Sequence, residues 1–189
     1  IISGLNRNIQ AQGACNSRAS VKDYEGILQT DAAINSGNSG GPLLDSTGDV
    51  IGVNAATSSD ANNISYAVPS NRVLKILERY NKNNGKITSP YIGVEYAMLN
   101  ADVAKTQNLP VGALIRSLVK DSPAQKAGLL KNDIITKLND KTVDFSLIST
   151  LNLNFEPGQI VKVEVYRRSS SSTQTQGEYT TIELTLGEK

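Results

Sequence analysis

The feature that most constrains this chain is a change of hydrophobic pattern at Ser70. Before that point, short apolar runs at 26–29, 50–54 and 64–68 are separated by Gly, Asn, Asp and Ser. Runs of that length with such punctuation are typical of an all-β barrel or sandwich. Beyond it, apolar side chains recur at helical spacing. They are Val73, Leu74, Ile76, Leu77 and Tyr80. The chain is therefore expected to begin with a β-rich unit that closes with a helix.

The predicted helix covers residues 71–84 and marks the end of the first unit. Ser70 or Asn71 is a suitable N-cap, and Gly85 follows the last helical residue. The polar stretch that comes next ends before Pro90, and residues 86–89 are the predicted linker. The sequence thus predicts a first domain over residues 1–85 and a second over residues 90–189.

The second domain is expected to mix strands with short helices. Its predicted strands lie at 91–96, 111–118, 134–138, 161–167 and 180–186. Its predicted helices lie at 100–107, 122–128 and 146–153, and the middle one has a proline in its first turn. Residues 169–176 are nearly all Ser, Thr and Gln, which predicts a mobile hairpin loop between the last two strands.

Composition excludes several classes of partner. Lys and Arg total 19 against 18 acidic residues, so the net charge is +1, and no basic stripe for nucleic acid stands out. No stretch approaches the roughly 20 apolar residues of a membrane span. Cys15 is the only cysteine and histidine is absent, so neither an internal disulfide nor a clustered metal site is expected. We expect no metal and no organic cofactor.

The most specific motif is the turn Gly37-Asn38-Ser39-Gly40-Gly41. A serine nucleophile has to project from a tight turn whose backbone N–H groups converge on one point, where they stabilise the oxyanion of a tetrahedral intermediate. Glycines on both sides permit the backbone angles of such a turn. The pattern predicts Ser39 as nucleophile, the Gly37 and Ser39 amides as an oxyanion hole, and Asn38 as the residue that shapes the turn. The alternative is an ordinary Gly-Ser loop.

Three flanking segments strengthen the nucleophile interpretation. Residues 29–35 precede the turn, and residues 48–54 and 64–70 follow it. In this order the segments resemble the second barrel of the HtrA/Deg serine proteases, a branch of the chymotrypsin-like fold. The resemblance covers nearly the whole chain. It implies a mainly β fold, in which the second six-stranded barrel of the protease is followed by an α/β PDZ domain and the first barrel is absent from this chain.

The family implies a Ser-His-Asp triad, of which only the serine is matched here. In chymotrypsin-like chains the His and Asp belong to the first barrel, and these 189 residues contain no histidine. The chain by itself is therefore expected to be a very poor hydrolase. Two explanations stay open. Either the chain is a fragment of a longer protease, because Ile1 begins in mid-domain, or the native protein is an inactive pseudoprotease.

The resemblance also implies a specificity pocket beside the turn. Ala33 and Ile34 precede the turn, and Ala55, Ala56 and Thr57 lie on the strand that would pair with the substrate backbone. None is charged, so we expect a shallow apolar pocket for Val, Ala, Ile or Leu before the scissile bond. Such residues become exposed in unfolded proteins, which matches the family's role in protein quality control. The alternative is that these residues are simply core packing.

Two further residues fall where the family has a regulatory loop. Arg7 matches the position of an arginine in a sensor loop, which relays PDZ or substrate engagement to the active site. Tyr24 lies near the end of the same long loop. The alternative for Arg7 is a solvated surface side chain.

The segment Tyr91-Ile92-Gly93-Val94 resembles the carboxylate-binding loop of HtrA PDZ domains. Free backbone N–H groups in such a loop can hold the terminal carboxylate of a peptide, which then adds as a strand beside residues 93–96. The helix at 146–153 should form the other wall of the groove, with Leu147 and Leu151 one turn apart. Residues 121–129 followed by 133–135 are also typical of these domains.

The resemblance implies an ATP-independent serine endoprotease of the cell envelope that acts on misfolded polypeptides and is regulated by a PDZ domain that binds C-terminal peptides. The alternative is a catalytically inactive pseudoprotease–PDZ module that captures C-termini without cutting. Family members assemble as homotrimers through an N-terminal region and work outside the cytoplasm, in a periplasm, cell envelope or organelle lumen. Both properties are expectations for the full-length protein.

Overall fold

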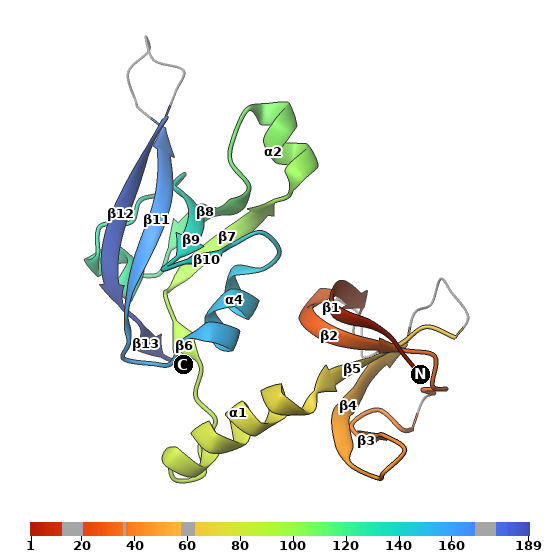
Figure 1. The fold of residues 1–189 in the computed structure, drawn as a ribbon. Helices are drawn as coiled ribbons and strands as arrows, with labels where there is room; N and C mark the ends of the chain where they lie inside the picture. The colour runs from red at the N-terminus through yellow and green to blue at the C-terminus, as the bar shows by residue number, and fades with distance from the viewer. Residues whose placement is uncertain (13–20, 36, 58–62, 169–176) are drawn as a thin grey trace. The chain divides into compact units, whose positions relative to one another are not determined.

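A computed structural model describes residues 1–12, 21–35, 37–57, 63–168 and 177–189 of the chain (Figure 1). It divides into two compact units, Ile1–Ile87 and Thr88–Lys189. The predicted linker over 86–89 includes Thr88 and Ser89, which belong to the second unit. Ser89 exchanges two backbone hydrogen bonds there with Lys189, of 3.0 and 3.1 Å.

The first unit is an antiparallel sheet followed by one helix. Its elements are β1 (Ile2–Gln12), β2 (Val21–Thr30), β3 (Pro42–Leu44), β4 (Val50–Thr57), β5 (Ser65–Pro69) and α1 (Ser70–Lys82). The strand order is β1-β2-β5-β4-β3, so the described residues form five strands where the sequence predicted a six-stranded barrel. The predicted mainly β character holds in both units.

The hairpin between β3 and β4 is fixed by one carboxylate. Oδ1 of Asp45 accepts hydrogen bonds from the Thr47 amide and hydroxyl and from the Asp49 amide, at 2.7–2.9 Å. The hydrogen bond from the Thr47 hydroxyl is the main reason why the pKa of the Asp45 carboxyl is lowered. Gly48, with φ +90°, completes the turn that the sequence predicted at this place.

Helix α1 differs from the prediction at both ends. It begins one residue earlier, with Pro69 as N-cap, and neither Ser70 nor Asn71 provides a side-chain cap. Ser70 is itself helical, so its hydroxyl does not occupy the capping position. The helix ends at Lys82, and Gly85 lies beyond it, where its amide donates to the Tyr80 carbonyl at 2.9 Å. No residue of α1 is buried in the structure.

The second unit is a larger sheet with three short helices. Its strands are β6 (Pro90–Tyr91), β7 (Val94–Leu99), β8 (Gly112–Leu118), β9 (Ile134–Leu138), β10 (Lys141–Thr142), β11 (Ile160–Arg168), β12 (Gly177–Thr185) and β13 (Gly187–Glu188). Its helices are α2 (Ala101–Gln107), α3 (Pro123–Lys126) and α4 (Leu147–Asn154). The main sheet has the order β12-β11-β9-β8-β7, with β10 beside β9, and β6 pairs with β13.

The predicted strand at 91–96 is wrong as one continuous element. The chain leaves β6 after Tyr91 and enters β7 at Val94, and Gly93 between them has φ +87°. A left-handed residue interrupts the regular hydrogen-bond pattern of a β-strand, and at Gly93 the chain leaves the strand for a loop. The three predicted helices of this unit are confirmed within about two residues. Each begins after an Asn or Ser side chain that caps it; these are Asn100, Ser122 and Ser146.

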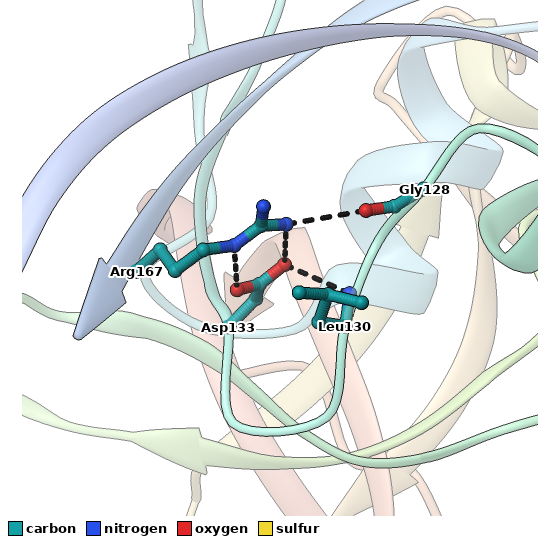
Figure 2. A network of polar contacts seen from close by, with 4 residues as sticks. All are labelled: Gly128, Leu130, Asp133 and Arg167. Carbon is teal, nitrogen blue, oxygen red and sulfur yellow. Dashed lines mark hydrogen bonds and ion pairs between the residues drawn. The ribbon is translucent and has the colours of Figure 1, made fainter. Parts of the chain in front are cut away.

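The core of the second unit is extensive and is flanked by an ion pair whose carboxylate is buried and whose guanidinium is 35% exposed. Apolar side chains of β8, β9, β11, α4 and the C-terminal strands form a single cluster. Beside it, Asp133 is 1% exposed and binds Arg167 through both carboxylate oxygens, with Nε at 2.8 Å and Nη2 at 2.7 Å (Figure 2). The Leu130 amide also donates to the Asp133 carboxylate, and Nη2 of Arg167 also donates to the Gly128 carbonyl. Asp133 therefore raises the pKa of Arg167 and ties the start of β9 to β11.

Two predictions fall on residues outside the described ranges. They concern Cys15 and the segment 169–176. Within the described part of the chain, the helices are too short or too polar to cross a bilayer.

Candidate functional site

The turn at 37–41 lies between the buried Ile34 and strand β3, and it exposes Ser39 to solvent. Gly37 has φ +108° and Gly40 has φ +85°, backbone angles that L side chains rarely adopt. The two glycines therefore let the chain reverse tightly on either side of the serine. Within the described residues, the Ser39 hydroxyl has no hydrogen-bond partner.

Asn38 shapes the turn through its side chain, as the sequence predicted it would. Its Oδ1 accepts a hydrogen bond from the Asn35 amide at 3.0 Å. Its Nδ2 donates to the Ala33 carbonyl at 3.3 Å. The Asn38 amide also donates to the Asn35 carbonyl at 3.2 Å. These three bonds fold the turn back on the segment that precedes it.

Strand β4 anchors the other side of the turn through Asn54. The Gly40 amide donates to the Asn54 carbonyl at 2.8 Å, and the Asn54 amide donates to the Gly41 carbonyl at 2.9 Å. The carbonyl of Asn38 accepts from the Gly41 amide at 3.0 Å. Among the described residues, by contrast, the amides of Gly37 and Ser39 donate to no acceptor. Two free amides beside an exposed hydroxyl can bind a developing negative charge on a substrate oxygen.

The predicted specificity residues occupy different environments. Ala33 is exposed, whereas Ile34 is 4% exposed and belongs to the core. Ala55 is half-buried on β4, and the side chains of Ala56 and Thr57 lie outside what the structure describes. Strand β3 stops opposite Val53. The β3 side of residues 55–57 therefore has no strand partner within the described pairings, and an extended peptide could pair there.

Arg7 and Tyr24 lie on strands, so their predicted place on a loop is wrong. Arg7 is an exposed residue of β1 opposite Ile27, and Tyr24 is a half-buried residue of β2 opposite Ile9. Strands β1 and β2 pair along their length as an antiparallel ribbon, which satisfies backbone groups that a loop would leave open. The register is shifted on both sides of Arg7. The regulatory role of both residues stays a prediction.

A second candidate site is a groove of about 310 Å³ in the second unit. It is lined by Ser89, Pro90, Tyr91, Ile92, Gly93, Val94, Tyr96, Leu147, Ile148, Leu151, Asn152 and Lys189. All six residues predicted for peptide binding are among these, because β7 and α4 bring them together as two walls. Leu147 and Leu151 are buried on the α4 side, as their spacing of one turn predicted.

The loop at 91–94 holds its carbonyls toward the protein. The Ile92 carbonyl accepts from the Ala124 amide and the Gly93 carbonyl from the Val119 amide, each at 2.9 Å. In a planar trans peptide the C=O and N–H groups point in opposite directions. The Gly93 and Val94 amides therefore face away from those donors. A Cβ on Gly93 would lie 2.2 Å from the Ser122 Cβ, so only glycine fits.

Sequence reasoning missed two residues of these sites. Asn54 lies at the end of the flanking segment 48–54, and its polar side chain after the apolar run Val50–Val53 was a usable signal of a role at the turn. Its Nδ2 lies 3.4 Å from the Asn38 carbonyl oxygen. Tyr96 was placed on the peptide-binding strand, but its hydroxyl also accepts from the Ile148 amide at 3.3 Å and so joins β7 to α4. No sequence signal indicates that bond.

Comparison with known families assigns each unit separately. The family model described as Trypsin matches residues 2–77, and the model described as PDZ domain matches residues 90–184. The first range contains the turn at 37–41, and the second contains the loop at 91–94. The fold and the two sites define a trypsin-like serine protease module joined to a PDZ domain.

Curated relatives match most of this chain. The serine protease Do-like HtrB of Bacillus subtilis is 35% identical over 187 residues, which cover 92% of this chain and 39% of the relative. A probable periplasmic serine endoprotease DegP-like of Chlamydia pneumoniae is 41% identical over 141 residues, covering 72% of this chain and 28% of the relative. The chain thus spans well under half the length of these curated relatives.

A solved structure agrees with these relatives. The HtrA-type protease AlgW with decapeptide has a TM-score of 0.68 and 28% identity, and the match covers 100% of this chain and 54% of that one. The chain belongs to the HtrA/Deg family of serine proteases.

Proposed function

We propose that this chain is the nucleophile-bearing half and the PDZ domain of an ATP-independent serine endoprotease. The observation that carries the proposal is the exposed Ser39 hydroxyl beside two amides, of Gly37 and Ser39, that have no acceptor in the described part. Ser39 attacks the scissile carbonyl, and the two amides stabilise the oxyanion of the tetrahedral intermediate. The first domain comprises residues 1–85 and the PDZ domain residues 90–189.

The general base of this reaction has to come from outside these 189 residues. Ser39 needs a group that takes its proton, and the sequence contains no histidine. Leu5, Leu44 and Val50 of the first unit are 66%, 52% and 51% exposed. Apolar side chains exposed to that extent on a trypsin-like half support their burial against a first barrel that carries the catalytic His and Asp.

The PDZ domain binds the C-terminal ends of polypeptides. Free amides around Gly93 hold the carboxylate, and the peptide adds as a strand to β7 with its last side chain toward Leu147 and Leu151. The relative AlgW was solved with a decapeptide, which supports a peptide as the natural occupant of this groove. Engagement of the PDZ domain regulates cleavage, and Arg7 and Tyr24 take part in that relay.

The substrates are unfolded polypeptides of the cell envelope. Uncharged residues around the turn favour Val, Ala, Ile or Leu before the scissile bond, with the backbone paired to residues 55–57. Several relatives are named periplasmic endoproteases, which supports a location outside the cytoplasm. The full-length protein assembles as a homotrimer, as expected for this family.

A second candidate function is peptide capture without cleavage. The absence of histidine from these residues is the observation that favours it. In that case the PDZ domain binds C-termini while Ser39 has no base. The protein as expressed from its whole gene distinguishes the two functions, because only the protease cleaves casein.

Ser39→Ala in that full-length protein is the decisive test. We expect casein cleavage to fall by at least about 10³-fold, since the nucleophile is lost, while PDZ binding of a free-acid peptide is unchanged. Ser46→Ala is the matched control, because Ser46 is an exposed serine in the next turn of the same unit. If the Ser39 variant still cuts casein at the wild-type rate, the nucleophile assignment is wrong. If the wild-type protein itself does not cut, the capture function replaces the protease.

A further inference from the structure

The carboxamide of Asn54 lies against the peptide that joins Asn38 to Ser39. Asn54 sits on β4, and both of its backbone polar groups already bind the turn, at Gly40 and Gly41. Its side chain adds a third contact, in which Nδ2 donates to the Asn38 carbonyl oxygen at 3.4 Å. The Gly41 amide donates to the same oxygen at 3.0 Å. Two donors from different segments therefore hold one carbonyl.

The direction of that carbonyl fixes the direction of the Ser39 amide. A trans peptide is planar, and its C=O and N–H bonds point to opposite sides. While the Asn38 oxygen stays on the side of Asn54, the Ser39 N–H has to point the other way, where it has no acceptor among the described residues. Rotation of this peptide would turn the amide away and replace it with a carbonyl oxygen, which repels an oxyanion.

The carboxamide oxygen of Asn54, Oδ1, makes no hydrogen bond with the described residues. This oxygen is also buried. A buried amide that is only half satisfied costs stability relative to an apolar side chain of the same size. A purely structural role at this position would be better served by leucine. The contact of Nδ2 with the turn is what a leucine could not provide.

We infer that Asn54 is a positioning residue of the oxyanion hole, which acts by holding the Asn38–Ser39 peptide in the orientation that presents the Ser39 amide to substrate. The inference rests on the proposed protease function. Asn54 does not itself touch the substrate in this role. Its effect therefore belongs to the transition state, in which the oxyanion forms, rather than to ground-state binding.

The test compares Asn54→Leu with wild type in the full-length protein, using a fluorogenic peptide that the wild type cuts and a peptide boronate of the same sequence. We expect kcat to fall about 10-fold, less than the 10²–10³ for loss of a whole oxyanion donor, because the Gly41 amide still holds the carbonyl. KM should stay within twofold, and boronate affinity should weaken by the same factor as kcat. Asn81→Leu, an exposed asparagine of α1, is the matched control.

Three results separate this inference from the proposed function. If Ser39→Ala cuts the peptide as wild type does, the protease function itself fails. If Ser39→Ala is inactive but Asn54→Leu keeps the kcat and boronate affinity of wild type, only the positioning role is overturned. If Asn54→Leu does not fold, Asn54→Asp decides, because it keeps the size but replaces the donor with an oxygen facing the Asn38 carbonyl. A kcat for Asn54→Asp within twofold of wild type would overturn the inference, and a fall of 10-fold or more would support it.

Discussion

The nucleophile turn and the PDZ loop use the same backbone arrangement but are held in place differently. In both, a carbonyl is bound on the protein side and the amide of the next residue faces outward: Asn38 before Ser39, and Ile92 before Gly93. In the turn, a Cβ on Gly37 or Gly40 would meet nothing within 4 Å. In the loop, a Cβ on Gly93 would lie 2.2 Å from a buried side chain.

The difference follows from the cores of the two units. Buried apolar side chains described in the first unit are Ile27, Ile34, Leu43 and Ala67, whereas the second unit has a large continuous cluster. The loop is therefore preformed by packing, and the turn depends on polar contacts of Asn38 and Asn54. A site held by a few hydrogen bonds can change shape at low cost, and this would suit the regulated cleavage proposed above.

The largest expected effect on stability comes from breaking the ion pair between Asp133 and Arg167 in the second unit. Arg167→Met leaves the carboxylate of Asp133 buried without a cation, which should lower the free energy of unfolding of this unit by about 3–5 kcal/mol. Peptide affinity measured well below the unfolding transition should stay the same, because the pair does not touch the groove. Hydrogen exchange of the β9 and β11 amides measures the loss, and the amides of the first unit should not respond.

Lys162→Met is the matched control for that variant. Its ion pair with Glu183 is 4.0 Å long, and both side chains are more than 60% exposed. Breaking such a pair should change stability by less than about 1 kcal/mol. Equal effects of the two substitutions would show that the burial of Asp133 is not what makes its ion pair important for stability.

The sequence predicted features that depend on neighbouring residues. It did not predict contacts that depend on how distant strands pair. Ser39 and Gly93 were predicted as site residues because a nucleophile turn and a carboxylate loop require glycines and particular neighbours at fixed spacing, and their roles stay predictions. Ser122 and Ser146, which the prediction counted as the first helical residues, are N-caps by the same kind of local rule. The contact between Asn54 and Asn38 was not predictable, since sixteen residues separate them and the register of β3 on β4 brings them together.

A similar reason explains the errors. Arg7 and Tyr24 were assigned to a loop by resemblance to the family, whereas cross-strand pairing places both on strands, β1 and β2. The break at Ile92–Gly93 was missed for the opposite reason. The apolar pattern of residues 91–96 continues through the loop, and only the left-handed backbone of Gly93 ends the strand.

A pair of glycine substitutions tests the comparison directly, with a smaller expected effect. Gly93→Ala adds a Cβ that collides with Ser122 and also has to adopt φ +87°, so we expect a cost of about 3 kcal/mol and loss of C-terminal peptide binding. Gly40→Ala meets no atom and carries only the conformational cost, about 1–2 kcal/mol.

The readout for this pair is binding of one peptide with a free or an amidated C-terminus. The wild type should prefer the free acid by at least about 10-fold, because charge-assisted bonds from amides to a carboxylate are lost on amidation. Gly93→Ala should abolish that preference, and Gly40→Ala should keep it. If Gly93→Ala binds the free acid as tightly as the wild type, the loop does not capture the carboxylate.

The smallest expected effect is the loss of stability at low pH, and it should appear in both units. The hydroxyl of Thr136 and then the ammonium of Lys137 lower the pKa of Glu164 in the second unit, as Thr47 lowers that of Asp45 in the first. A carboxyl whose pKa is lowered by folding stabilises the native state above its unfolded pKa, about 4, and loses that contribution as the pH falls through its folded pKa.

Glu164→Gln should therefore destabilise the second unit at pH 7 and have less effect at pH 3, in urea unfolding of the full-length protein. Asp45→Asn is the counterpart in the first unit, where Oδ1 accepts from the Thr47 and Asp49 amides, and an amide oxygen can accept the same two bonds. A pH-independent effect of Glu164→Gln would mean that Thr136 and Lys137 stabilise the fold without favouring the charged form of Glu164.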